Sequence, residues 1–85
     1  MDKYDKGKLK VLIKMILIQR PYEMTANQIA DIINSYDFGF RTSITSAKIG
    51  RLLAYELSKH DNHFLKDIHC YKEDKNGVYM YYIKH

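Results

Sequence analysis

The sequence predicts an α+β fold in which three helices precede a C-terminal β-hairpin. Three segments, at about residues 8–19, 25–36 and 45–59, carry apolar residues at the i, i+3, i+4 spacing that gives a helix one buried stripe. The last third of the chain instead holds two runs rich in aromatic and β-branched residues, separated by a turn that contains Asn76-Gly77. The predicted order is therefore helix, helix, helix, hairpin.

The length of 85 residues suits one domain, so residues 1–85 are expected to form a single unit with an ordered core at about 8–84. A hydrophobic fraction of 46% supports a thin core, which a partner or a second copy would help to cover. The net charge of +4 is unevenly placed: residues 1–20 carry +4, residues 21–40 carry −3 and residues 41–60 carry +3. This pattern permits an anionic partner, although ordinary solvated helix faces would also produce it.

The first predicted helix, residues 8–19, is more widely apolar than one buried stripe requires. Its main stripe consists of Leu9, Leu12, Ile13, Ile16 and Leu17. Val11, Met15 and Ile18 widen the apolar arc, which fits either the seam of a homodimer or a central helix well covered by its own chain. Residues 1–7 are charged and are expected to fray. Pro21 ends the helix, because the residue before a proline avoids the α region.

The second predicted helix begins with a capping box, in which Thr25 is the N-cap and Gln28 the N3 residue. It is expected to run to the connector at residues 36–43, which is rich in turn formers. Within the connector, Gly39 is expected to take a left-handed conformation, and Arg41-Thr42 is a candidate for a brief strand.

The third predicted helix, residues 45–59, has two contrasting faces behind an N-cap at Thr45. Its buried stripe is expected to consist of Ile49, Leu52, Leu53 and Leu57. The first two turns of the opposite face are small, polar or basic, and the whole face comprises Ser46, Ala47, Lys48, Gly50, Arg51, Ala54, Tyr55 and Ser58. Short side chains let a helix approach a surface closely, while Lys48 and Arg51 are long enough to reach phosphates or base edges. The pattern predicts the recognition helix of a DNA-binding domain.

The predicted hairpin has strands at residues 64–72 and 78–84, joined by a turn at 73–77. Four tyrosines gather in it: Tyr71, Tyr79, Tyr81 and Tyr82. They fit strand packing with the hydroxyls turned to water. A surface for base stacking or for a protein partner is the alternative interpretation.

A metal site and a catalytic site are not expected. His60, His63, His69 and Cys70 are ligand types that zinc accepts, but their spacing matches no established finger. Adjacent His69 and Cys70 would also point to opposite faces of a strand. The sequence has no Gly-rich phosphate loop, no HExxH and no nucleophile with a nearby base, so we expect neither an enzyme nor a cofactor.

The sequence favours a cytoplasmic protein without a membrane partner. Cys70 is the single cysteine, so no disulfide forms within the chain, as is typical of a reducing compartment. The apolar run at residues 11–18 is interrupted by Lys14, lacks a small-residue cleavage site and is too short to span a bilayer.

Three stretches together resemble the winged helix-turn-helix superfamily: TANQIADII in the second helix, ITSAKIGRLL in the third, and the hairpin closed by Lys75-Asn76-Gly77. The resemblance covers about residues 8–84 and specifies the superfamily but no single member. The run TSAKIGRLL is also similar to winged-helix modules attached to viral and plasmid replication proteins. The connector at residues 36–43 is longer than the turn of a simple helix-turn-helix, and winged-helix members often insert residues there.

The resemblance implies a three-helix winged helix-turn-helix fold with a C-terminal β-hairpin wing and with the third helix in the major groove of double-stranded DNA. The implied DNA contacts are Thr45, Ser46, Ala47, Lys48, Arg51 and Tyr55 on the helix, with Lys72 and Lys75 on the wing. Glu73 and Asp74 offset the two wing lysines, so the wing is expected to contribute less than the helix.

The expected function is that of a small sequence-specific transcriptional regulator, which binds paired half-sites as a homodimer joined through Val11, Met15 and Ile18. The alternative is a winged-helix module for protein–protein interaction, or an accessory factor in replication that does not read bases directly. Both stay open at this level, because a fold does not fix a function.

Overall fold

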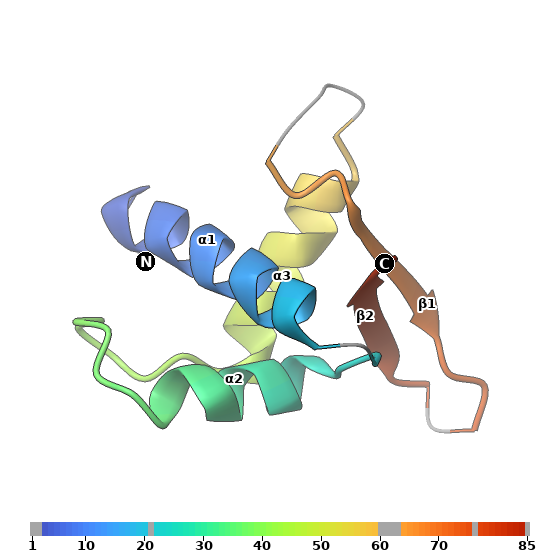
Figure 1. The fold of residues 1–85 in the computed structure, drawn as a ribbon, viewed down its shortest axis with the longest axis horizontal. Coiled ribbons are helices and arrows are strands. Elements are labelled where there is room, and N and C mark those ends of the chain that lie inside the picture. Colours follow the sequence, from blue (N-terminus) through green and yellow to red (C-terminus); the bar gives the residue numbers. More distant parts are fainter. Residues whose placement is uncertain (1–2, 21, 60–63, 76, 85) are drawn as a thin grey trace.

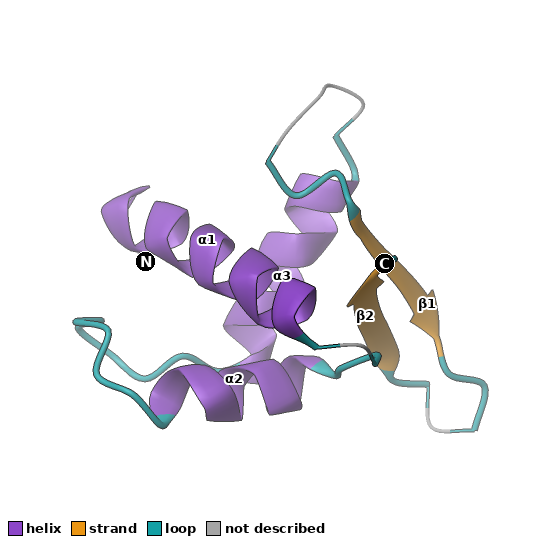
Figure 2. Ribbon diagram, in the orientation of Figure 1, coloured by secondary structure: helices purple, strands orange, loops and turns teal. Residues whose placement is uncertain are grey.

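The computed structural model describes residues 3–20, 22–59, 64–75 and 77–84. Three helices come first, α1 (Lys3–Gln19), α2 (Ala26–Asn34) and α3 (Ser46–Leu57), and a two-stranded antiparallel sheet follows, β1 (Ile68–Lys72) and β2 (Tyr79–Ile83). Figure 2 shows this segregation of helices and strands, and it confirms the predicted α+β class and element order. The hairpin stands at one end of the helices, beside the C-terminal end of α1 and the N-terminal end of α2 (Figure 1).

Helix α1 begins at Lys3, so the expectation that residues 1–7 fray is wrong for residues 3–7. Apolar periodicity starts only at Leu9, but tertiary contacts secure the earlier turns. The Lys8 ammonium lies 5.1 Å from the centroid of the Tyr4 ring and 5.0 Å from that of Phe40. It also donates a hydrogen bond of 2.8 Å to the carbonyl oxygen of Phe38 in the connector.

The capping box at the start of α2 is confirmed. The Thr25 hydroxyl accepts from the backbone N–H of Gln28 at 3.1 Å, and the Gln28 side chain accepts from the backbone N–H of Thr25 at 2.9 Å. Helix α2 ends at Asn34, slightly before the predicted position, and Gly39 in the connector has the expected positive φ of 79°.

Asn34 joins the end of α2 to the start of α3. Its side-chain oxygen accepts from the backbone N–H of Ile44 at 3.0 Å, and its amide nitrogen donates to the carbonyl oxygen of the same residue at 2.7 Å. One side chain therefore satisfies both backbone groups of Ile44, as a neighbouring strand would. The connection fixes the backbone immediately before the N-cap Thr45.

The predicted strand at Arg41-Thr42 is wrong, because these residues form a bend. The additional pairing of the hairpin comes from Met24, between α1 and α2. Met24 and Tyr81 exchange backbone hydrogen bonds of 2.9 and 2.8 Å as an isolated antiparallel bridge. Since Cys70 pairs with Tyr81 from the other side, β2 is the middle chain at this position. Met24 thus pairs with the edge of β2 that β1 leaves open, and it adds a short third segment to the two-stranded sheet.

The core gathers apolar side chains from all three helices and from the hairpin. Its buried members are Leu9, Ile13, Ile16, Leu17, Met24, Ile29, Ala30, Ile33, Ile44, Ile49, Leu53, Leu65, Ile68 and Tyr81. The predicted α3 stripe needs a correction, because Ile49 and Leu53 are buried but Leu52 and Leu57 are only partly covered. Glu56 takes the remaining buried position on α3, and its carboxylate is neutralised by Lys10 of α1 and by Lys59, just after α3.

Candidate nucleic-acid interface

The outward face of α3 is a narrow strip of small side chains around one arginine. Ala47, Arg51, Ala54 and Ser58 are exposed, and they follow one another at helical spacing. The N-cap that starts the helix is the predicted one, because the Thr45 hydroxyl accepts from the backbone N–H of Lys48 at 3.1 Å. In the part of the chain that the structure describes, Arg51 forms no ion pair with a carboxylate. Its guanidinium is therefore available to a ligand.

Lys48 is half-buried, and its side chain bonds to the connector between α2 and α3. Its ammonium donates to the Thr42 hydroxyl at 2.9 Å and to the carbonyl oxygen of Ser43 at 3.2 Å. An ammonium has three donors, so these bonds hold the charge in one place and leave one donor. The sequence predicted Lys48 as a DNA contact; the structure adds that it also holds the residues before α3 in place.

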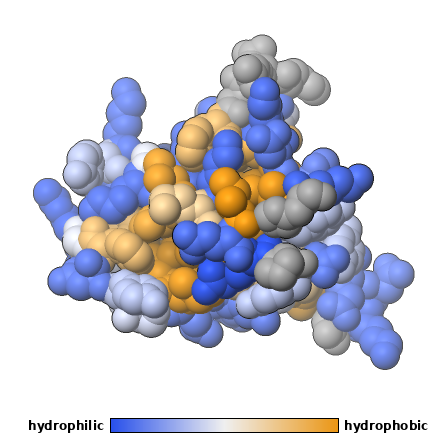
Figure 3. All heavy atoms as spheres, in the orientation of Figure 1, coloured by the Kyte–Doolittle hydropathy of each residue, from blue (hydrophilic) through white to orange (hydrophobic). Residues whose placement is uncertain are grey.

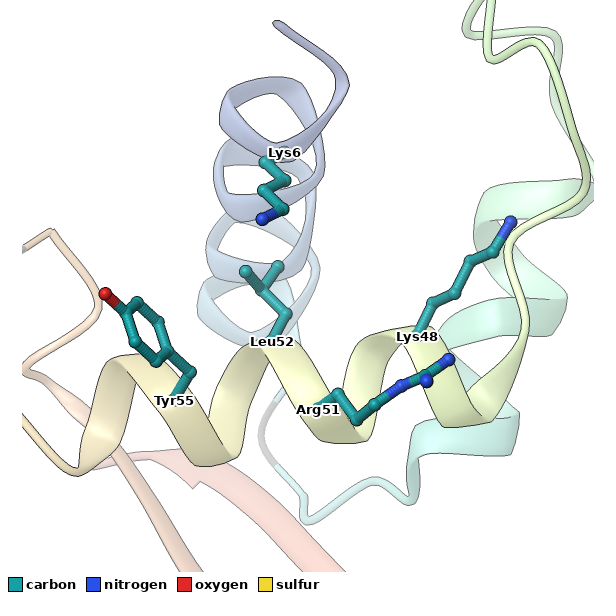
Figure 4. Close-up of a pocket in the computed structure, with 5 residues that line it drawn as sticks. All are labelled: Lys6, Lys48, Arg51, Leu52 and Tyr55. Carbon is teal, nitrogen blue, oxygen red and sulfur yellow. The ribbon is translucent and has the colours of Figure 1, made fainter. Parts of the chain in front are cut away.

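A basic depression of about 320 Å³ lies where α1 crosses α3, and Figure 4 shows the residues that line it. Lys48, Arg51, Leu52 and Tyr55 come from α3, and Lys6 comes from α1. Lys6 extends over Leu52, while Lys48 and Arg51 both point toward the N-terminal end of α3 (Figure 4). The sequence patterns did not identify Lys6, because its proximity to α3 depends on how two helices cross.

Buried Glu56 of α3 links the two helices at the same crossing through an ion pair with Lys10 of α1. Only 3% of Glu56 is exposed, and its carboxylate lies 2.6 Å from the Lys10 ammonium of α1 and 3.1 Å from that of Lys59. The hydrogen bond from Lys10 lowers the pKa of the Glu56 carboxyl, burial opposes this effect, and the hydrogen bond from Lys59 lowers the pKa further. Lys59 also lies 4.6 Å from the centroid of the Tyr55 ring. Glu56 thus holds α1 at the distance from α3 that forms the depression.

On its other side, α3 faces the hairpin across an uncharged groove of about 450 Å³. The groove is lined by Gly50, Leu53, Ala54, Leu57, Ser58, Cys70, Tyr79 and Tyr81. It continues into a smaller depression, of about 240 Å³, that includes Thr25 and Asn27 at the start of α2 and Ser46 and Ala47 at the start of α3. The predicted contact residues of α3 are therefore divided, with the basic ones on the α1 side and Ser46 and Ala47 on the hairpin side.

The wing lysines lie apart from the basic depression. Lys72, Asp74 and Lys75 are exposed near the hairpin turn, and Glu73 beside them is half-buried. Partial desolvation raises the pKa of the neighbouring Tyr71, and the carboxylates of Glu23 and Glu73 raise it further. Acidic side chains from two segments, the one before α2 and the hairpin turn, thus lie near this end of the hairpin.

The four hairpin tyrosines do not act as one surface. Tyr81 is buried in the core, where desolvation raises the pKa of its hydroxyl. Tyr79 lines the groove beside α3. Tyr71 and Tyr82 lie on the opposite face of the hairpin, where His69 stacks on the Tyr82 ring with centroids 5.4 Å apart.

Of the four residues weighed as zinc ligands, His69 and Cys70 belong to the described residues, and His60 and His63 lie outside them. His69 contacts Tyr82 while Cys70 lines the groove, so these two side chains occupy opposite faces of β1. Within the described ranges, no cluster of three or more His, Cys, Asp or Glu side chains is placed to hold a metal ion.

Neither a protein family, nor a curated protein, nor a solved structure matches this chain. None of the described helices has both the length and the apolar character needed to cross a membrane. Any function must therefore be argued from the arrangement of the chain's own side chains.

Proposed function

We propose that this protein is a small double-stranded DNA-binding protein of winged helix-turn-helix architecture, with α3 in the major groove. One observation carries the proposal: α3 presents Arg51, which forms no ion pair with any described residue, outward among Ala47, Ala54 and Ser58, whose short side chains permit close approach. The three helices, the Met24 bridge and the hairpin are compatible with this architecture. The protein would act by occupying a site, without chemistry of its own, as a cytoplasmic regulator of transcription.

Arg51 and Lys48 have different tasks in this proposal. Arg51 can fork onto the O6 and N7 acceptors of a guanine, which discriminates against other bases by about 1–3 kcal/mol. Lys48, held by Thr42 and Ser43, contributes its remaining donor to a phosphate, which positions the protein without reading sequence. Thr45, Ser46 and Ala47 lie at the end of the helix that enters the groove first, and Tyr55 lies further along it.

The apolar surface of α1 favours a homodimer on paired half-sites. Val11, Met15 and Ile18 are 44%, 49% and 48% exposed, and they form a ridge opposite the buried stripe of the helix. Figure 3 shows apolar side chains gathered over α1 on this face, with polar side chains around them. The same ridge is the specific observation behind a second candidate function, a module that docks another protein.

The test is selection of binding sites from a random pool of duplex DNA, followed by affinity measurements on the selected site. Arg51→Gln is expected to lower affinity for that site by about 5- to 150-fold and to relax the preference at one base pair. Lys84→Gln is the matched control, because Lys84 is exposed and lines neither the depression nor the groove. An unchanged affinity of Arg51→Gln would contradict major-groove reading by α3. Absence of any DNA binding, together with a stable hetero-complex, would favour the protein-docking function.

A further inference from the structure

Three lysines of α1, Lys6, Lys10 and Lys14, recur at four-residue spacing along the side of the helix that borders α3 and the segment before β1. Two of them have intramolecular partners. Lys10 pairs with Glu56, and Lys14 lies 3.9 Å from the Asp67 carboxylate and donates to the carbonyl oxygen of Phe64 at 2.8 Å. Lys6 has no ion pair in the described ranges, and it is the member of the row that lines the basic depression.

Three cationic side chains line the depression; Lys6 lies over Leu52, and Lys48 and Arg51 point toward the N-terminal end of α3 (Figure 4). The three come from two helices, and none of the described residues that line the depression is acidic. Lys48 is already fixed by its bonds to the connector, so part of the positive charge is preorganised. A phosphate group accepts several hydrogen bonds at once and suits such a set of donors.

The hairpin side of α3 lacks the positive charge of the depression. The groove beside Tyr79 is uncharged, and at the far end of the hairpin Glu73 and Asp74 offset Lys72 and Lys75. Glu23 adds a further negative charge near Tyr71. In Figure 4, the α1 ribbon lies on one side of α3 and the hairpin ribbon on the other. A polyanion that lies along α3 is therefore attracted more strongly toward α1 than toward the wing tip.

We propose that the depression between α1 and α3 is a subsite for a backbone phosphate of the duplex, and that Lys6 binds this phosphate together with Lys48. The nucleic acid is thus anchored on the α1 side of α3, and the wing supplies little of the binding. This inference rests on the proposed function and assigns the orientation of the duplex on the same helix.

The experiment measures duplex affinity as a function of salt for the full chain and for Lys6→Gln. Loss of one phosphate contact reduces the slope of log K against log salt by about 0.9, and it weakens binding about eightfold at 0.1 M salt. The loss is expected to be the same for selected and random DNA, because a phosphate contact carries no sequence information. Lys75→Gln at the wing and Lys84→Gln at the end of the hairpin remove the same charge elsewhere and are expected to keep the wild-type slope.

The outcomes separate this inference from the proposed function. If the wild type binds DNA and Lys6→Gln behaves as Lys84→Gln does, the subsite is refuted while DNA binding stands. A larger loss for Lys75→Gln than for Lys6→Gln would place the anchor on the wing and also refute it. If NMR titration shows that inorganic pyrophosphate binds beside Lys6 and Arg51 but duplex DNA does not bind, the depression is a site for a free anion, and both proposals are overturned.

Discussion

At the residue scale, the position of α3 depends on side chains that the periodicity of the helices does not mark. Asn34 replaces a neighbouring strand by bonding both backbone groups of Ile44. Glu56 is charged but buried, and it connects α1 with the last turn of α3 through Lys10 and Lys59. Each of these residues is polar, yet its contribution is structural, because it sets the geometry of the exposed residues beside it.

Asn34→Ala is expected to lower the free energy of unfolding by about 1–2 kcal/mol, because it removes two hydrogen bonds and leaves the Ile44 backbone without a protein partner. Urea denaturation monitored by circular dichroism measures this. Asn27→Ala is the matched control, since Asn27 is an exposed asparagine on the same helix, and its effect should stay within about 0.5 kcal/mol. Equal stability of the two variants would show that the Asn34 bonds contribute nothing.

Glu56 predicts a specific acid dependence of stability. Its pKa is lowered in the folded protein from the ordinary value of 4.5, so the folded state binds the proton less readily than the unfolded chain. The stabilisation is complete above the ordinary pKa and is lost as pH falls from there through the folded pKa. Glu56→Gln should therefore destabilise the protein at neutral pH by about 1–2 kcal/mol and flatten the loss of stability below pH of about 5.

Thermal unfolding measured as a function of pH tests this dependence. Asp31→Asn, an exposed carboxyl on α2, is the control and should keep the wild-type profile. A Glu56→Gln variant whose acid dependence matches that of the wild type would contradict the role given to the Lys10–Glu56–Lys59 cluster.

At the element scale, α1 has three distinct sides, and each is used differently. One stripe is buried in the core, the lysine row borders α3, and the apolar ridge faces solvent. The sequence showed the wide apolar arc but left open whether the fold covers it. The structure leaves Val11, Met15 and Ile18 about half exposed, so the helix is not covered on that side by the described residues.

Met15→Lys is expected to convert a dimer into a monomer, because it places a charge at the centre of the apolar ridge. Light scattering over a range of protein concentrations measures the change, and circular dichroism checks that the helices persist. Asn27→Lys adds the same charge to an exposed position on α2, away from the ridge, and should leave the dimer intact. A wild-type protein that stays monomeric at the highest attainable concentration would rule the dimer out.

At the scale of the whole molecule, α3 separates a basic side from an uncharged and partly acidic one. The helix crossing with α1 concentrates Lys6, Lys48 and Arg51, whereas the hairpin turn combines Lys72 and Lys75 with acids. The sequence already gives the sign of each charge, and on that basis it predicts that the wing contributes less to DNA binding than α3 does. Which charges share one surface became visible only when the elements were placed in space.

The sequence by itself determined the features that depend on neighbouring residues. Helical periodicity fixed the order of the elements, the Thr25 and Thr45 caps fixed two helix starts, and Gly39 fixed a left-handed turn. These features follow from interactions within one or two turns of chain, so a local pattern is sufficient to reveal them.

Only the tertiary structure decided the contacts between elements: the Met24–Tyr81 bridge, the Asn34 bonds to Ile44, the burial of Glu56 and the approach of Lys6 to α3. Polar residues such as these follow no periodicity, and their role depends on which segment the folded chain brings opposite them. The physical reason is that helix crossing and hairpin placement are set by how the whole core packs, and no single stretch of sequence carries that information.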